Sequence, residues 1–497
     1  MKTLYELAKI NQKNIKIIES MIPLEKSSPL KKLNTIVLAK SEIDENSAMQ
    51  EIYGKKNIAA FSRLKSRLKD ILIRSTLLQN ITAEASGSRM NEAHNQLRHV
   101  LASRLLLDLK ARTLSVEIAE KSILKAIKYH ATESIIFFAR LLVSYFGTSE
   151  YNKYKLNKYL AIQQKYLRVY EWEIKAENYF LDLQRNQLQS LAAANEETKE
   201  KAKKYVNELD AATDIQTYFF ILNRYKVRAA YYEYQKDYES LLELSENILN
   251  EFTSEFKSAT LIQSIILRKI WALIQAGRNE ETIRIGIKNL SKVIPGSLSW
   301  FVLSHYTLKA QLYNGDYKEA IKLISQIVGH PKFQKTGETY KELFYTTLGY
   351  IHLIVDSGIV DDQNVISQKV PEFKIGKHLN TTPLFSKDKR GINVSILLLH
   401  VAFLLQRKDF NIIIDKVDSL NQYAYRYLRK DDSFRSNCMI KMVIQMTRAD
   451  FNPIRTERYT HDLLEQLKEV KLAGSGENIE TEIIPYEILW KIMMKSL

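Results

Sequence analysis

The chain has 497 residues, of which 45% are hydrophobic and 26% are charged, which is the balance of an ordinary soluble protein. Its formal net charge of +16 is compatible with a nucleic acid, an acidic protein or an anionic membrane surface as partner, and equally with a lysine-rich solvated surface. The single cysteine, Cys438, excludes an intramolecular disulfide and a cysteine-only metal site.

The distribution of proline predicts an all-α fold. The chain has only eight prolines, and none lies between Pro29 and Pro295. Proline removes a backbone donor and clashes with the preceding helical turn, so a long run without it favours helix. Segments with alternating apolar and polar residues are few, and we therefore expect little or no sheet.

The first residues predict a cytoplasmic protein. Met1 runs straight into an amphipathic helix in which Glu6 and Lys9 interrupt any apolar core, so we expect no signal peptide. No window approaches the roughly 18 consecutive apolar residues of a membrane span. The lone cysteine also fits a reducing compartment.

Residues 1–130 are expected to form an N-terminal helical region. The pattern predicts one helix over 1–21, short helices over 33–40 and 42–53, and a basic amphipathic helix over 57–78. Preceded by a helix and the Gly54 turn, this last helix loosely resembles the recognition helix of a helix-turn-helix protein, which implies contact with nucleic acid. The alternative is a purely structural role, in which the helix packs in the core and its basic face is solvated. The basic side chains of this face are Arg63, Lys65, Arg67, Lys69 and Arg74.

Residues 131–355 are expected to form pairs of helices. Helices are expected over 91–110, 116–129 and 133–145. The tyrosine-rich helical segment over 152–194 and the Glu/Lys/Ala-rich helix over 196–210 that follow suit an exposed helical arm or a long helix packed on one side only. Three hairpins are clearest: 215–235 with 238–252, 257–276 with 280–290, and 298–313 with 317–328. A further helix is expected over 340–355.

The turn between the helices of the third hairpin carries the strongest local signal. Gly315 ends the first helix, because glycine enters the left-handed conformation without a Cβ penalty. Asp316 is expected to cap the next helix with its carboxylate, Tyr317 to wedge between the two helices, and Ala320 to allow close approach. Asp237-Tyr238 and Asp409-Phe410 repeat the acidic and aromatic pair.

This turn resembles that of the tetratricopeptide repeat, and Pro331 also fits the pattern. The resemblance implies a right-handed superhelical stack of helix-turn-helix hairpins, an α-solenoid whose first helices line a concave groove. Positions 237, 316 and 409 lie 79 and 93 residues apart (316 − 237 and 409 − 316), and half of each interval exceeds the repeat of about 34 residues. The alternative is an irregular all-α domain, since any helical hairpin favours a glycine stop and an aspartate cap.

The repeat pattern breaks over 356–392, which holds Pro371, Pro383 and Gly358, and we expect an irregular insertion there. Its charged loop could contact a partner or simply start the next helix. The residues of that loop are Lys387, Asp388, Lys389 and Arg390. Residues 393–497 are expected to resume the repeats, with helices over 393–405, 411–428, 433–448 and 455–470 and a capping helix over 486–497.

Motifs for enzymatic chemistry are absent from the sequence. It has no GxxxxGK[ST], GxGxxG, HExxH, CxxC or GxSxG. His94 and His99 are five residues apart, which misaligns them on a helix as a zinc pair. We therefore expect no catalytic residue, no cofactor and no metal.

A tyrosine stripe is the main candidate for partner binding. Tyr218, Tyr225 and Tyr232 share one side of a helix near Arg224 and Arg228, and the tetratricopeptide resemblance places this helix on the concave groove. Packing between repeats is the alternative role of these rings.

The sequence thus favours a non-catalytic protein–protein interaction scaffold or adaptor that binds a protein or extended peptide. A second hypothesis is a nucleic-acid-associated regulator that uses the basic N-terminal helix, with the repeats as a sensor or partner-binding module. A third is an enzyme with its site on the 356–390 insertion.

Overall fold

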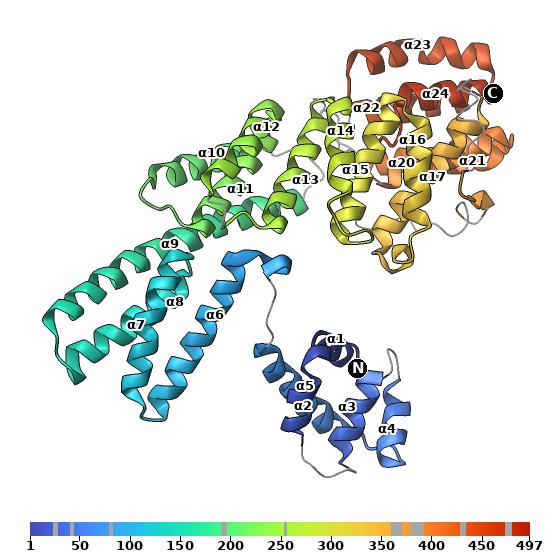
Figure 1. Ribbon diagram of the computed structural model, residues 1–497. Coiled ribbons are helices and arrows are strands. Elements are labelled where there is room, and N and C mark those ends of the chain that lie inside the picture. Colours follow the sequence, from blue (N-terminus) through green and yellow to red (C-terminus); the bar gives the residue numbers. More distant parts are fainter. Residues whose placement is uncertain are drawn as a thin grey trace. The chain divides into compact units, whose positions relative to one another are not determined.

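The computed structural model describes residues 1–22, 28–39, 44–78, 83–189, 196–252, 256–358, 370–376, 378, 392–427, 434–472 and 480–497 (Figure 1). Every regular element in these ranges is helical, which confirms the all-α prediction. The chain forms two compact units, Met1–Gln163 and Gln164–Leu497, and the division falls inside the long helix α9 (Lys153–Gln189).

The N-terminal helices of the first unit share one apolar core. They are α1 (Lys2–Ile10), α2 (Ile15–Met21), α3 (Pro29–Ala39), α4 (Glu45–Tyr53) and α5 (Ile58–Leu77). Phe61, Leu68 and Leu72 of α5 are fully buried in this core, as the apolar face of the expected helix predicts.

The single helix expected over 1–21 is interrupted at Asn11, where a short 3₁₀ turn (Gln12–Asn14) separates α1 from α2. The buried Asn11 amide donates to the Leu72 carbonyl at 3.2 Å and to Thr76 Oγ1 at 2.9 Å, both on α5. These bonds hold Asn11 at φ −91°, ψ 8°, outside helical geometry. The interruption is therefore caused by a tertiary contact that the local pattern does not contain.

The first unit continues with α6 (Ala83–Asp108), α7 (Arg112–Lys128) and α8 (Thr132–Ser144), which pack in succession, α6 on α7 and α7 on α8. A π-helical turn over Tyr145–Ser149 leads to the start of α9. There the Tyr159 hydroxyl donates to Glu120 Oε1 of α7 at 2.9 Å, and the Tyr159 ring stacks on Phe146. These contacts fix the first part of α9 to the unit.

In the second unit the three expected hairpins are present and are preceded by α10 (Glu196–Ala211). They pair α11 (Tyr218–Gln235) with α12 (Tyr238–Asn247), α13 (Ala259–Gln275) with α14 (Asn279–Leu290), and α15 (Leu298–Asn314) with α16 (Tyr317–Val328). Each hairpin also contacts the next, through α12 on α13 and α14 on α15 (Figure 1). Gly286 permits the second contact, because a Cβ there would come within 2.2 Å of Thr307 Oγ1.

Among the described residues, seven pairs of consecutive helices, two in the first unit and five in the second, are joined by the same turn geometry. In each, a residue with positive φ ends the first helix, and the next residue donates its N–H to the carbonyl five positions back, at 2.8–3.1 Å. This is the 6→1 bond of a Schellman turn. The positive-φ residues are Lys110, His130, Lys236, Gly277, Gly315, Lys408 and Asp450. The Gly315 prediction is confirmed. The acidic and aromatic pairs marked the turns at Lys236 and Lys408, whereas the turns at Lys110, His130 and Asp450 were not predicted from residue type.

Asp316 occupies the N-cap position of α16, but its carboxylate accepts no hydrogen bond from the N–H groups of that helix, so this part of the capping prediction is wrong. Its Oδ2 instead accepts from the Asn314 side chain at 3.1 Å. Asp237, the corresponding residue before α12, does cap its helix, since Oδ1 accepts from the Ser240 N–H at 3.1 Å. The competing amide of Asn314 accounts for the difference.

We expect Lys110→Gly to stabilise the first unit by about 0.5–1 kcal/mol, because Lys110 is exposed and its φ of +64° strains a side-chain-bearing residue. Urea unfolding measures the change. Lys121→Gly, at an exposed position inside α7, is the matched control and should destabilise by about 1 kcal/mol. If Lys110→Gly destabilised the protein as much as Lys121→Gly does, the inference that the backbone at residue 110 is strained would be wrong.

The remaining helices of the second unit enclose one large core. They are α17 (Glu338–Asp356), α20 (Ile392–Gln406), α21 (Phe410–Tyr427), α22 (Phe434–Arg448), α23 (Pro453–Glu469) and α24 (Tyr486–Lys495). Every residue of α20 from Ile392 to Leu405 is buried, and α17, α21 and α24 all contact this helix. A helix that is apolar all round is surrounded by others. Here α20 forms the buried centre of this core.

A buried ionic network joins α22 to the segment before α24. Arg435, 3% exposed, donates to both carboxylate oxygens of Glu482 at 2.8 and 2.9 Å, and to Glu487 at 2.9 and 3.0 Å. It also donates to the carbonyls of Leu467 and Val470. Hydrogen bonds to these carboxylates hold the pKa of the Arg435 guanidinium above its ordinary value despite burial.

Candidate functional site

The basic helix α5 exposes most of its predicted basic residues. Arg63, Arg67, Lys69 and Arg74 are exposed on α5 and lie outside the core. Lys65 is half-buried and pairs with Glu45 of α4 at 2.7 Å, so it serves the packing of the bundle. Contact of this face with nucleic acid stays a prediction.

The tyrosine stripe lies largely inside the hairpin formed by α11 and α12. Tyr218 is buried against the rings of Phe252 and Phe256, and Tyr225 is buried with its hydroxyl 3.4 Å from Ser245 Oγ. Tyr232 is half-buried in the same packing. The structure thus gives these rings a packing role, and their role in binding stays a prediction.

The two arginines near the stripe are held in ion pairs. Arg224 pairs with Glu251 at 2.5 Å and Arg228 with Asp210 at 2.7 Å. Both must exchange a protein carboxylate for a ligand before they could contact a partner. The loop candidates Lys387, Asp388, Lys389 and Arg390 lie outside the described residues.

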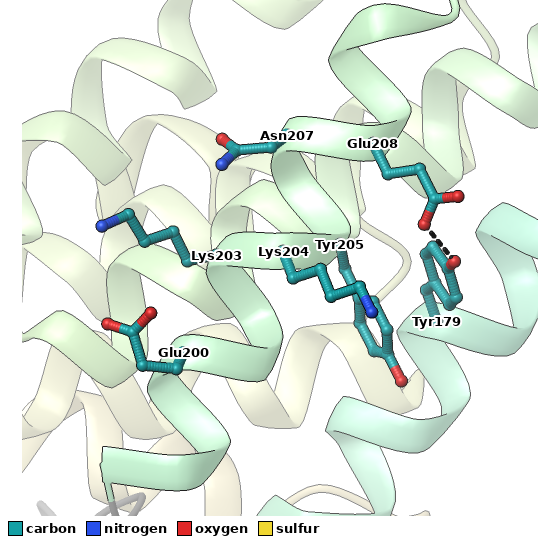
Figure 2. A pocket seen from close by; sticks show the side chains of 7 residues that line it. All are labelled: Tyr179, Glu200, Lys203, Lys204, Tyr205, Asn207 and Glu208. Atoms are coloured by element: carbon teal, nitrogen blue, oxygen red, sulfur yellow. Dashed lines mark hydrogen bonds between the residues drawn. The ribbon is translucent and has the colours of Figure 1, made fainter.

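An open groove of about 720 Å³ lies in the second unit along α9 and α10 (Figure 2). Its floor is formed by Tyr179 of α9 and Tyr205 of α10, whose rings stack with their centroids 3.7 Å apart. Lys203, Lys204 and Asn207 are exposed along α10 beside this pair. The exposed carboxylate of Glu200 and the carboxylate of Glu208 also line the groove, and Glu208 is paired with Lys175 (Figure 2). Lys203 and Lys204 therefore leave an excess of positive charge beside the tyrosine rings, which suits an extended chain that carries acidic side chains.

Two carboxylates hold the tyrosine pair in place. Glu208 accepts from Lys175 and from the Tyr179 hydroxyl, each at 2.5 Å, and the hydrogen bond from Lys175 lowers the pKa of Glu208. Asp182 accepts from Tyr205 at 3.1 Å and from Lys201 at 2.6 Å, and the hydrogen bond from Lys201 lowers its pKa. Burial raises the pKa of both tyrosines, so the two hydroxyls stay protonated and the stacked rings form a rigid surface.

Sequence reasoning assigned Tyr179 and Tyr205 to an arm packed on one side and did not select them as site residues. The available signal was the succession of a tyrosine-rich helix and a lysine-rich helix. It did not specify which ring of one helix meets which ring of the other, because that depends on how the two helices cross.

A second cluster of polar side chains lies beside α20. The imidazole rings of His378 and His400 meet edge to face with centroids 5.2 Å apart, and both are buried. Burial lowers the pKa of His378 to about 4, and burial together with the nearby His378 and Lys416 lowers that of His400 to about 3. Within the described ranges no three His, Cys, Asp or Glu side chains are placed to hold a metal ion.

These histidines predict a stability loss in acid. The unfolded chain binds protons at a histidine pKa of about 6.5, whereas the folded state resists them down to about 4 and about 3. The unfolded state therefore binds more protons below pH 6.5, and stability falls as the pH is lowered. The free energy of unfolding, measured with urea, should fall between pH 7 and pH 5. We expect this fall to be about 2 kcal/mol smaller in His400→Leu than in the unmodified protein. His461→Leu, at an exposed site on α23, is the control and should leave the loss unchanged.

Comparisons with protein-family models, with curated proteins and with solved structures find no match to this chain. Among the described residues, no helix combines the length and the apolar character needed to cross a membrane. The tetratricopeptide resemblance therefore stays a prediction that rests on the turn residues.

Proposed function

We propose that this protein is a non-catalytic interaction scaffold whose helical hairpins present a groove to an extended, acidic segment of a protein partner. The observation that best supports the proposal is that the same Schellman turn recurs between successive helices. Hairpins that close in the same way can be laid side by side, and such arrays present a long continuous binding surface.

The stacking that we propose is a tetratricopeptide-like right-handed array over α11 to α16. Support comes from the contacts between successive hairpins and from the additional contact of α13 with α15, the first helices of two neighbouring hairpins. The turn residues Lys236, Gly277 and Gly315 recur at intervals of 41 and 38 residues (277 − 236 and 315 − 277). These intervals exceed the family's repeat of about 34 residues, so the array is a longer variant.

The groove over α9 and α10 is the surface that we assign to the partner. Its stacked tyrosines supply contact area that costs little side-chain entropy, and Lys203 and Lys204 supply positive charge. Cys438 is a buried free cysteine, which fits the cytoplasm as the compartment of this interaction.

Site-specific photocrosslinking in the native host tests the proposal. A photoreactive amino acid replaces Asn207 in the groove, and the same amino acid replaces the exposed Ile287 of α14 as a matched control. We expect a discrete protein adduct from position 207 and none of the same mass from position 287. Lys203→Glu with Lys204→Glu should abolish the adduct, whereas Lys288→Glu with Lys292→Glu, an equal change of charge at exposed sites, should preserve it.

An adduct that survives charge reversal in the groove would contradict the assignment of this surface. If neither position gives a discrete adduct and purification recovers no protein partner, the scaffold proposal itself is wrong.

A nucleic-acid-associated regulator is the second candidate, and the exposed face of α5 favours it. Arg63, Arg67 and Arg74 lie on one exposed side of α5, with Lys69 exposed on another side, and contacts of such arginines with phosphates weaken steeply with salt. Arg63→Glu with Arg67→Glu should then abolish a mobility shift of DNA or RNA at low salt, whereas Arg284→Glu with Lys288→Glu should not. Absence of any shift by the unmodified protein at low salt eliminates this candidate.

A further inference from the structure

A small cavity in the second unit contains a buried amine that no function discussed above uses. The cavity measures about 230 Å³ and is bordered by the turn at Gly277, by Lys309 and Tyr313 of α15, and by the Arg435 network. Ile274, Leu472 and Pro485 add apolar wall. It lies apart from the tyrosine groove, so it is independent of the scaffold proposal.

Lys309 is 3% exposed, and its Nζ finds no hydrogen-bond acceptor among the described residues. It lies over the face of the Tyr313 ring, whose centroid is 4.0 Å away. That ring is fixed because the Tyr313 hydroxyl donates to the Glu482 carbonyl at 3.1 Å. An ammonium group buried without acceptors is costly, so this site favours the neutral amine.

The charged groups around Lys309 do not reverse that preference. The carboxylates of Glu482 and Glu487 are bound to Arg435, and Glu480 lies 4.0 Å from His305 Nε2. Burial lowers the pKa of Lys309 to about 7, the nearby Glu482 and Glu480 partly oppose this shift, and Arg435 adds to it. At neutral pH a large share of the amine is therefore unprotonated and carries a free electron pair.

The wall of the cavity holds both charges, with Arg435 and Lys471 as cations and Glu487, which is paired with Arg435, as the carboxylate. The buried group of this wall that has no hydrogen-bond partner among the described residues is the amine of Lys309, which lies beside the apolar side chains of Ile274, Leu472 and Pro485. A neutral amine attacks an electrophilic carbon, and a small uncharged molecule can use the apolar wall. We propose that the cavity receives a small aldehyde or ketone, which condenses with the Nζ of Lys309 to form an imine.

The condensation needs no further reactant. The nitrogen electron pair attacks the carbonyl carbon, and the π electrons of the C=O bond move to oxygen. Both protons of the neutral amine end on that oxygen, which departs as water, and a C=N bond replaces the C=O bond. Tyr313 acts as a positioning residue, since its fixed ring holds Nζ at the cavity wall.

Reductive trapping on the full-length protein tests this site. The protein is incubated with propanal and cyanoborohydride at pH 7, and the alkylated lysines are quantified by mass spectrometry of peptides. Lys309 should be modified at least tenfold faster than the exposed Lys322, because an ordinary lysine with a pKa of about 10.4 is almost entirely protonated at that pH. Raising the pH to 9 should accelerate Lys322 strongly and Lys309 about twofold.

Two further measurements separate the cavity from mere amine reactivity. An aldehyde-functionalised dextran, a polymer far larger than the cavity, should label Lys322 at pH 9 but not Lys309. Lys309→Met should keep the urea-unfolding midpoint while removing the fast-reacting site, and Lys203→Glu with Lys204→Glu should leave the labelling of Lys309 unchanged. Modification of Lys309 no faster than that of Lys322, or equal labelling of Lys309 by the small and the large aldehyde, would overturn the proposal.

Discussion

Replacing Arg435 with methionine is expected to lower the free energy of unfolding of the second unit by about 3–5 kcal/mol. The change leaves the fully buried carboxylate of Glu482 without its cation and removes the donor to the carbonyls of Leu467 and Val470. An uncompensated buried charge is far costlier than the lost contact itself. Urea unfolding followed by tryptophan fluorescence gives the value, since Trp490 on α24 lies in the adjacent core.

Two variants control this measurement. Arg455→Met removes an exposed arginine that lies 3.6 Å from Asp450, and it should change the stability by less than about 0.5 kcal/mol. Adding Glu482→Leu to Arg435→Met should recover part of the loss, because the double variant no longer buries an unpaired charge. A double variant as unstable as the sum of the single changes would show that the network acts through packing rather than charge.

In a separate variant, replacing Phe403 with alanine is expected to lower the free energy of unfolding of the second unit by about 3–5 kcal/mol. Phe403 lies in the last turn of α20, is 1% exposed, and stacks on Phe373 with centroids 5.6 Å apart. Since α20 is enclosed by α17, α21 and α24, the surrounding helices have little freedom to collapse into the space left behind. The midpoint of urea unfolding measures the effect.

The matched control for Phe403 is Ile287→Ala, which truncates a large apolar side chain that is 54% exposed on α14. Its effect should stay within about 0.5 kcal/mol. A loss below about 1 kcal/mol for Phe403→Ala would mean that α20 is less tightly enclosed than the structure shows.

The sequence was a good guide to the helices and a poor guide to the contacts among them. Gly315 marked the end of α15 correctly because a residue without Cβ leaves a local signature. Lys110, Lys236 and Lys408 adopt the same positive φ without being glycine, so the residue type at that position does not mark the turn, although the Asp237-Tyr238 and Asp409-Phe410 pairs follow two of them. Asn11 breaks the first helix through a tertiary contact, since its partners lie about sixty residues away on α5.

The candidate sites show the same limit. The basic face of α5 was predictable, because helical periodicity alone separates its arginines from Phe61 and Leu68. The amine of Lys309 was not, because its cavity joins α15 to residues near positions 435 and 487. Residues so far apart in the chain are brought together only by the packing of α15, α22 and α24.

The burial of α20 on every side has a consequence for synthesis on the ribosome. Its apolar residues, Ile392 to Leu405, follow α17 but emerge before α21 and α24, and the 89 residues that follow Gln406 up to Lys495 (495 − 406) take about 5–20 s to translate. During that interval the apolar segment lacks the cover of α21 and α24. We expect molecular chaperones to shield this segment until translation of α24 supplies the last cover.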